Sequence, residues 1–157
     1  HLVLSTLHTN DAVSTAMRLV DMGLESYLVA ASTQAILAQR LIRKLCGNCR
    51  TSRQLDASEQ SWVRSVMGES ASLDGFQEGA GCNQCNHTGY HGRIGVYELL
   101  EIDYTLADAL RRNDPAGFEN AARVQEGYRP LVENALDYAR RGITSLAEAM
   151  RLSGMVD

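Results

Sequence analysis

The sequence predicts an α/β protein that carries a small metal-binding insert and ends in a helical region. Three observations support this: an apolar segment followed by a helical pattern at the N-terminus, two CxxC pairs, and helical periodicity beyond Asp103. The chain has 157 residues, of which 45% are hydrophobic and 22% charged, so a packed core is expected and disorder is not. The formal net charge of -4 argues against wholesale wrapping of nucleic acid.

The first part of the chain has the pattern of a strand, a turn and a helix. Residues 1–8 (HLVLSTLH) cluster apolar groups as a buried strand does, and residues 12–20 repeat apolar groups at helical spacing. We expect Asn10 or Asp11 to cap this helix and Gly23 to end it in a left-handed conformation. A second helix over residues 25–38 and a short strand that includes Leu41 and Leu45 follow.

The middle and the end of the chain differ in character. Residues 46–85 are polar and rich in glycine, with one helix expected over 57–66, and a strand is expected over 93–102. Helices are then predicted over 104–112, 115–125 and 131–141, with Pro115 in a first turn. Ser145 with Glu148 three residues later is the pattern of a capping box and predicts a fourth helix.

All four cysteines occur in two CxxC pairs, Cys46 with Cys49 and Cys82 with Cys85. Each CxxC turn can present two thiolates to one side, and four thiolates satisfy tetrahedral Zn²⁺ with no open position, which is typical of a structural site. Disulfides are the alternative, but no segment of these residues resembles a secretory signal, so we expect a reducing compartment, which favours metal binding. We therefore expect one structural zinc ion, without which the insert is disordered.

The histidines have two interpretations each. His87 and His91 follow the second CxxC pair, so a mixed site is an alternative, although the cysteines already fill four positions. His1 and His8 stand at the two ends of the predicted first strand, and His8 lies where open α/β sheets place their ligand crevices. A structural histidine with satisfied hydrogen bonds is the alternative for His8, and the residue pattern does not decide between them.

Basic residues gather around the first CxxC pair, where no acidic residue occurs between Ser26 and Leu55. They can neutralise phosphate groups, or they can balance the charge of about −2 on a zinc tetrathiolate, and both interpretations stay open. Single-stranded nucleic acid is disfavoured because aromatic side chains for stacking are missing here. The residues concerned are Arg40, Arg43, Lys44, Arg50 and Arg53.

Three segments together resemble the C-terminal part of the bacterial type II secretion and type IV pilus assembly ATPases. They are HLVLSTLHTNDA at 1–12, AQRLIRKLC at 38–46 and CNQCNHTGYHGRIGVYELLEID at 82–103, and the resemblance covers almost the whole chain. Residues 93–103 and 136–154 are most similar to the ATPase of the mannose-sensitive haemagglutinin pilus. Because His1 is not an initiator residue and leads directly into an apolar run, we expect a piece of a longer protein.

The resemblance implies the C-terminal part of a RecA-like P-loop ATPase that uses ATP and Mg²⁺. Such a motor is a homo-hexamer in the bacterial cytoplasm, peripheral to the inner membrane, which it contacts through a platform protein; no nucleic acid is involved. His1 and His8 match the family's histidine box near the terminal phosphate, Gln39 and Arg40 match its QRL segment in the same core, and the four cysteines match its metal-binding insert.

The resemblance also implies a division of the chain. Residues 1–45 would belong to the ATPase core, 46–85 to the zinc insert, 86–102 to a returning core strand and 103–157 to a C-terminal helical bundle. The chain departs from the family in having no GxxxxGK[ST] loop and no acidic Walker B strand. We therefore expect it to hydrolyse no ATP alone. A stand-alone zinc-stabilised module that binds a partner protein and no nucleotide is the alternative function.

Overall fold

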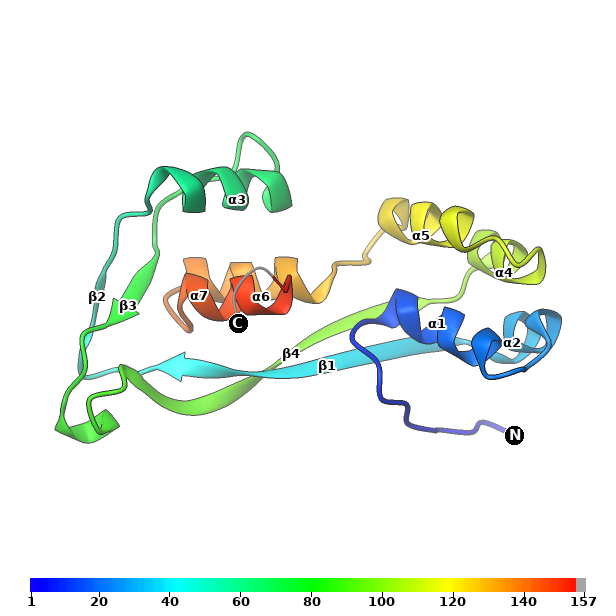
Figure 1. Cartoon of the computed structure of the whole chain (residues 1–157), viewed down its shortest axis with the longest axis horizontal. Helices are drawn as coiled ribbons and strands as arrows, with labels where there is room; N and C mark the ends of the chain where they lie inside the picture. The colour runs from blue at the N-terminus through cyan, green and yellow to red at the C-terminus, as the bar shows by residue number, and fades with distance from the viewer. Residues whose placement is uncertain (155–157) are drawn as a thin grey trace. The chain divides into compact units, whose positions relative to one another are not determined.

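Helices and strands follow one another along the chain in the computed structural model, which describes residues 1–154 (Figure 1). No described helix combines the length and the apolarity needed to span a bilayer. The elements are α1 (Ala12–Asp21), α2 (Ser26–Ser32), β1 (Ala35–Leu45), β2 (Arg50–Ser52), α3 (Ala57–Met67), β3 (Gln77–Gly79), the 3-10 helix η1 (Asn83–Cys85), β4 (Tyr90–Glu101), α4 (Tyr104–Arg111), α5 (Pro115–Val124), α6 (Leu131–Arg140) and α7 (Leu146–Leu152).

Two compact units make up the chain, and the strands β1 and β4 each contribute to both. The first unit comprises His1–Gln39 and Tyr97–Pro130, and the second comprises Arg40–Val96 and Leu131–Asp157, of which the structure describes residues up to 154. β1 and β4 are hydrogen-bonded neighbours in one two-stranded sheet. The helices that follow Asp103 are therefore shared between the units, α4 and α5 in the first, α6 and α7 in the second.

Four helices build the core of the first unit. α1 packs on α2 and α5, and α4 packs on α2 and α5 (Figure 1). Phe118 is completely buried among them, and burying such a side chain stabilises the fold by about 1.5–3 kcal/mol. The other large buried side chains of this core are Val29, Ile36, Leu100, Leu106 and Leu110.

Most helices begin at a residue whose side chain caps the first turn, and they begin where the sequence predicts them. Asp11 accepts a hydrogen bond from the backbone N–H of Ser14 and so caps α1, while Gly23 follows that helix with φ +88°. Pro115 stands in the first turn of α5, as predicted. The predicted helices that begin near residues 57, 104, 115, 131 and 145 are all confirmed, and the first four end within one residue of the predicted bounds.

The helix predicted over residues 25–38 is shorter in the structure. α2 ends at Ser32 instead of residue 38, and the remaining residues begin β1. Ile36 is buried while Leu37 is exposed, which is the two-residue alternation of a strand. The backbone N–H of Ile102 also donates to the carbonyl oxygen of Gln34 at 2.8 Å. Pairing with β4 therefore outweighs the local helical pattern here.

The predicted first strand is also wrong in this structure. Residues 1–8 are exposed and belong to no strand. A strand buries its apolar side chains only when neighbouring strands take up its backbone hydrogen bonds, and the described strands pair only as β1 with β4 and β2 with β3. The apolar run of residues 2–4 has no such neighbour among the described residues.

The second unit joins a small hairpin-like sheet to three helices. β2 and β3 pair antiparallel, with Thr51 opposite Glu78. α3 packs on α6, and α6 on α7, around the buried side chains of Trp62, Val63, Phe76, Leu136 and Leu146. The backbone N–H of Leu45 donates to the carbonyl oxygen of Ile143 at 2.9 Å, which attaches the loop before α7 to the end of β1.

The mixed α/β class is confirmed by these elements. The described strands form two sheets of two strands each, so the RecA-like core stays a prediction. The same holds for the C-terminal bundle and for the division at residues 45, 85 and 102.

Candidate metal centre

Two tight turns position the four cysteines. Cys46 comes directly after β1, and its carbonyl oxygen accepts hydrogen bonds from the N–H groups of Cys49 (3.3 Å) and Arg50 (3.1 Å). Cys82 precedes η1, and its carbonyl oxygen accepts from Cys85 (3.2 Å) and His87 (2.8 Å). Each CxxC segment is therefore folded back on itself by its own backbone, which turns both of its thiols to one side.

The four sulfur atoms lie at the corners of a small cluster. Sγ of Cys46 is 3.8 Å from Sγ of Cys82, and Sγ of Cys85 is 3.8 Å from those of Cys49 and Cys82. All four sulfur atoms lie within 4.8 Å of one another. Ligands arranged tetrahedrally at about 2.3 Å from a zinc ion place their sulfur atoms about 3.8 Å apart. The donor set and its spacing thus fit one tetrahedral metal ion.

The disulfide alternative is wrong for this structure. All four cysteines are free. A disulfide needs sulfur atoms about 2.05 Å apart, far below the 3.8 Å between the closest pairs here.

Hydrogen bonds to sulfur prepare part of the cluster for the thiolate form. The side-chain amide of Asn48 donates to Sγ of Cys82 at 3.3 Å and lowers the pKa of that thiol to about 6. Burial raises the pKa of Cys85, but the N–H groups of Cys82 (3.2 Å) and Gly89 (3.3 Å) donate to its sulfur and bring the pKa below the usual value. Thiolates are the form that binds metal.

Cys49 differs from its neighbours. Desolvation raises the pKa of its thiol to about 12, so the four sulfur atoms do not all ionise together near neutral pH without a cation. A bound metal ion supplies the positive charge that deprotonates a coordinating thiol. A cation held among the four sulfur atoms would therefore lower the pKa of the Cys49 thiol.

Glycines allow the close approach of the backbone around the cluster. A Cβ atom on Gly89, which has φ +78°, would lie 2.6 Å from the carbonyl oxygen of Gly79. A Cβ on Gly81, with φ +88°, would lie 2.8 Å from that of His87. Both positions need glycine, for space and for the left-handed conformation.

The histidines near the cluster are not part of it. His87 and His91 are exposed, and the group of side chains close enough to share a metal ion contains only the four cysteines among the described residues. Their predicted position beside the site or in solvent is consistent with this arrangement.

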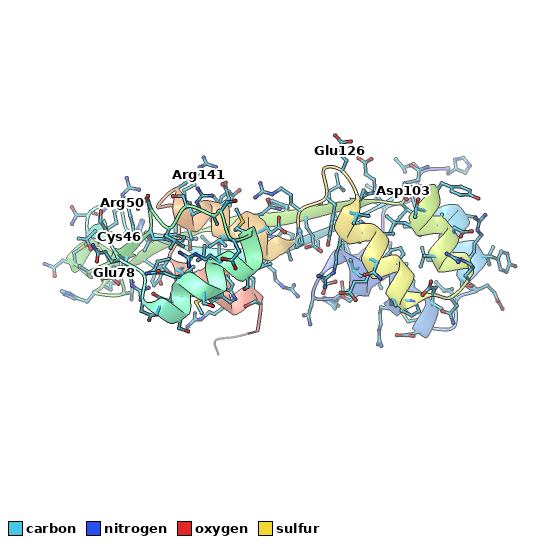
Figure 2. The ribbon with its side chains drawn as sticks, turned by 90° about the horizontal axis from the view of Figure 1, so that it is seen from above. Cys46, Arg50, Glu78, Asp103, Glu126 and Arg141 are labelled. Atoms are coloured by element: carbon cyan, nitrogen blue, oxygen red, sulfur yellow. The ribbon has the colours of Figure 1, made fainter. Side chains whose placement is uncertain are left out.

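Two of the basic residues around the cluster, Arg50 and Arg53, have protein partners. Arg53 forms ion pairs with Glu59 at 2.7 Å and Glu78 at 3.3 Å, and Arg50 donates to the carbonyl oxygen of Gly142 at 3.2 Å. In Figure 2, Cys46, Arg50 and Glu78 are seen at the same end of the second unit. Carboxylates thus neutralise part of the positive charge of these residues. From the sequence, that charge could have served either to bind phosphate or to balance the thiolates.

Arg43 joins a polar network that the residue pattern does not predict. Its guanidinium bonds Glu148 at 2.7 and 3.0 Å and lies 4.0 Å above the ring of Tyr90, whose hydroxyl is 2.7 Å from Oγ of Ser145. The backbone N–H of Arg43 donates to the same carboxylate at 2.8 Å. Ser145 caps the N–H of Glu148, as predicted, but Glu148 bonds Arg43 instead of closing a capping box.

Opposing effects act on the two charges of this pair. Burial raises the pKa of Glu148, but its hydrogen bonds to Arg43 outweigh burial and leave that pKa below the usual value. The hydrogen bond to Glu148 also raises the pKa of Arg43. The pair is ionised on both sides and holds α7 against β1.

The other predicted site residues are not gathered into a pocket. His1 and His8 lie in the exposed segment before α1, outside any described strand. Gln39 is exposed and Arg40 half-buried, both on β1. The arrangement of a histidine box beside a nucleotide therefore stays a prediction.

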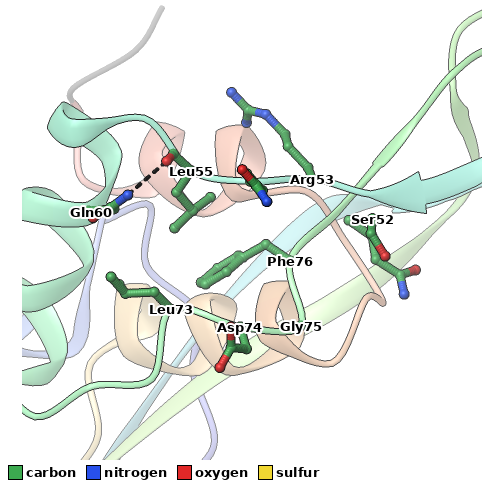
Figure 3. A pocket seen from close by; sticks show the side chains of 10 residues that line it. Ser52, Arg53, Leu55, Gln60, Leu73, Asp74, Gly75 and Phe76 are labelled. Atoms are coloured by element: carbon green, nitrogen blue, oxygen red, sulfur yellow. Dashed lines mark hydrogen bonds between the residues drawn. The ribbon is translucent and has the colours of Figure 1, made fainter.

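A separate cavity of about 600 Å³ lies in the second unit, away from the cysteines. Figure 3 shows Leu55, Leu73 and Phe76 together in this cavity, with Gln60 donating a hydrogen bond to the carbonyl oxygen of Leu55 at 2.9 Å. None of the predicted site residues lines it except Arg53, which is already paired with carboxylates.

The family model described as "Type II/IV secretion system protein" matches residues 1–151. The chain belongs to this family. It is 40% identical over 154 residues to the type II secretion system ATPase E of Vibrio cholerae, covering 98% of the chain and 30% of that protein. It is 37% identical over 153 residues to the type IV pilus assembly ATPase TfpB of Acinetobacter baylyi, covering 97% and 26%.

Similarity within the secretion-system family extends to further relatives. The type II secretion system protein HxcR of Pseudomonas aeruginosa is 40% identical over 158 residues, covering 98% of the chain and 28% of that protein. The chain thus spans about 30% of the length of the curated relatives it matches. The predicted resemblance to type II secretion and type IV pilus ATPases is confirmed.

Proposed function

We propose that Cys46, Cys49, Cys82 and Cys85 hold one structural zinc ion. The 3.8 Å spacing of three sulfur pairs, with all four sulfur atoms within 4.8 Å of one another, is the observation that carries this proposal, because a tetrahedral zinc tetrathiolate has sulfur atoms about 3.8 Å apart. Four protein ligands leave no position for water or substrate. The ion therefore joins the two turns that flank the insert and takes no part in chemistry.

Elemental analysis of the purified protein tests the zinc site. We expect about one zinc ion per chain, because four thiolates favour this metal over harder cations. Cys82→Ser removes a ligand and should reduce the zinc content to a small fraction, whereas Asn83→Ser, at an exposed neighbour in η1, should leave it unchanged. A fully folded wild-type protein without metal would contradict the proposal.

We propose further that the chain is part of a motor ATPase that powers type IV pilus assembly or type II secretion. Membership of the secretion-system family, whose relatives carry the names of secretion and pilus assembly ATPases, supports this function. The parent would act as a homo-hexamer in the cytoplasm, at an inner-membrane platform protein. The similarity of residues 93–103 and 136–154 favours the mannose-sensitive haemagglutinin pilus.

The nucleotide chemistry needs parts of the protein outside these 157 residues. The only lysine is Lys44, and a phosphate-binding P-loop requires a lysine after glycine, whereas Arg43 precedes Lys44. The residues present therefore do not by themselves cradle ATP and Mg²⁺. Within the parent, His1 and His8 would sense the terminal phosphate or position water, and Gln39 and Arg40 would lie on the wall of the same core.

Turnover measurements test this assignment. The isolated 157-residue chain should release phosphate from ATP only at background rate, and robust metal-dependent turnover would contradict it. In the parent protein, His8→Ala should lower ATP turnover more than it lowers the free energy of unfolding. His87→Ala, at an exposed histidine beside the cysteines, is the matched control and should leave turnover unchanged. Equal losses of turnover and stability in His8→Ala would indicate a structural histidine.

A further inference from the structure

A buried glutamate holds the start of α1. Glu98 on β4 is only 2% exposed, and its Oε1 accepts a hydrogen bond from the backbone N–H of Ala12, the first residue of the helix. Val96 and Leu100, two residues to either side on the strand, are completely buried. Glu98 therefore occupies a core position in the alternation of β4, where an apolar side chain is the usual choice.

The helix does not need this carboxylate as its cap. Asp11 already accepts a hydrogen bond from the N–H of Ser14 at 2.7 Å and serves as the N-cap. Burying a second carboxylate costs free energy that only partners can offset, and the N–H of Ala12 together with the positive end of the helix dipole supplies part of that offset. What Glu98 adds is a connection between the helix and β4.

Three successive anchors hold the segment that follows His8. The first anchor joins two hydroxyls, since Oγ1 of Thr9 is 2.6 Å from Oγ1 of Thr15. The second is the hydrogen bond that Oγ1 of Thr15 donates to the carbonyl oxygen of Asp11 at 2.7 Å. Ala12 is the third anchor, through Glu98. Of the three, only the bond to Glu98 leaves α1 and its preceding turn; the other two are local.

We infer that Glu98 is a positioning residue for His8. Its carboxylate fixes the start of α1, and hence residues 9–12, against β4, so that the backbone leading from His8 has a defined place. The inference rests on the proposed function, in which His8 acts at the terminal phosphate. Misplacing a catalytic group by a small distance can cost orders of magnitude in rate, so a buried residue with no contact to substrate can affect turnover.

Steady-state ATP turnover of the parent protein tests this role through a double-mutant cycle. We expect Glu98→Ala to lower kcat about tenfold while KM for ATP stays within about twofold, since it acts through His8 and not on binding. In a His8→Ala background the same substitution should lower kcat no further. Glu98→Gln keeps the volume and an acceptor oxygen, so it should retain more activity, and it replaces the alanine variant if that one does not fold.

Amide hydrogen exchange provides a readout that is independent of activity. In Glu98→Ala, exchange should rise at residues 9–12, while α4 and α5 keep their protection. Glu101→Ala, at an exposed glutamate on the same strand, is the matched control and should change neither exchange nor kcat.

Several outcomes would overturn the inference. They are wild-type kcat in Glu98→Ala, losses of kcat that add to those of His8→Ala, or unchanged exchange at Ala12. If His8→Ala itself keeps the wild-type kcat, the proposed role of His8 fails, and exchange at Ala12 alone then decides whether Glu98 holds the segment.

Discussion

Single side chains attach α7 to the rest of the second unit, and among the described residues of this helix Glu148 is the one with the most hydrogen bonds. Its carboxylate is almost buried and accepts hydrogen bonds from the backbone N–H and guanidinium of Arg43 and from Arg151 at 3.0 Å. A buried carboxylate with this many donors stabilises the fold only while it is ionised. Losing it leaves the donors of Arg43 without their acceptor.

Glu148→Gln should therefore lower the free energy of unfolding by about 2 kcal/mol at pH 7, less than for a wholly buried pair because Arg43 is 40% exposed. The folded pKa of Glu148 lies below its usual value, so its stabilisation is present above the usual pKa and is lost as pH falls through the folded pKa. Urea titrations of both proteins from pH 7 downward measure this. A difference that grows on acidification would contradict the assignment.

Gly89, whose N–H donates to Sγ of Cys85, and the exposed Gly92 allow a comparison of two glycines at a similar backbone conformation. Gly89 and Gly92 have similar positive φ values, +78° and +80°, so alanine strains the backbone at both. A Cβ at Gly89 meets the backbone of Gly79, whereas one at Gly92 meets nothing within 4 Å. We expect Gly89→Ala to weaken zinc retention against a competing chelator about tenfold or more, and Gly92→Ala to leave it near wild type. Equal effects would mean that conformation alone matters there.

At the scale of elements, the cysteine cluster is joined to helices that lie far from it in sequence. Leu45, next to Cys46, bonds Ile143, and Arg50 bonds Gly142, so the loop between α6 and α7 rests on the turn that carries the first CxxC pair. The insert is thus part of a larger structure than residues 46–85.

Removing the metal should therefore loosen more than the insert. With a strong chelator, amide exchange should rise in residues 46–52 and 77–90 and also in residues 141–146, while α1, α2, α4 and α5 of the first unit keep their protection. Hydrogen exchange with mass spectrometry measures this, and re-addition of zinc is the control. Exchange confined to 46–85 would show that the contacts at Gly142 and Ile143 carry no coupling.

Elements whose local signals agree with their environment were predictable from sequence. The helices that begin after Asp11, Asp56, Asp103, Asp114 and Ser145 have a capping side chain and an apolar face, and all form close to the predicted bounds. Residues 33–38 were not predictable, because their helical pattern yields to pairing with β4, which is a contact between distant parts of the chain.

The sites follow the same division. Two CxxC pairs predict the cysteine cluster because four equal ligands have one simple arrangement. The role of Glu98 and the pairing of Glu148 with Arg43 were not predictable, because the partners lie 86 and 105 residues away. Glu98 did leave a signal: it occupies the buried phase of the alternation Val96, Glu98, Leu100. A charged residue in that phase indicates a specific partner.

In the molecule as a whole, each of the two units has its own core. A substitution in one core is therefore expected to leave the other unit unchanged. Phe118 lies at the centre of the first core, and Trp62, the only tryptophan, is buried in the second. Phe118→Ala should lower the free energy of unfolding by about 3–5 kcal/mol, as a large cavity does, without changing the zinc content.

Tryptophan fluorescence gives the complementary measurement. Chelation should change the emission of Trp62, because it lies in the unit that contains the cysteines. Loss of zinc from folded Phe118→Ala would contradict the independence of the two cores. Elemental analysis, carried out beside the fluorescence measurement, shows whether folded Phe118→Ala keeps its zinc.

The contact between Gly79 and Gly89 has a consequence for protein engineering. Two backbone segments are in contact there with no side chain between them. The segment that would have to be moved with Cys82 and Cys85 therefore runs from Gly79 to Gly89. Anyone transplanting this metal knuckle into another scaffold would have to carry both glycines along, because a graft limited to the cysteines would leave the loop unable to close.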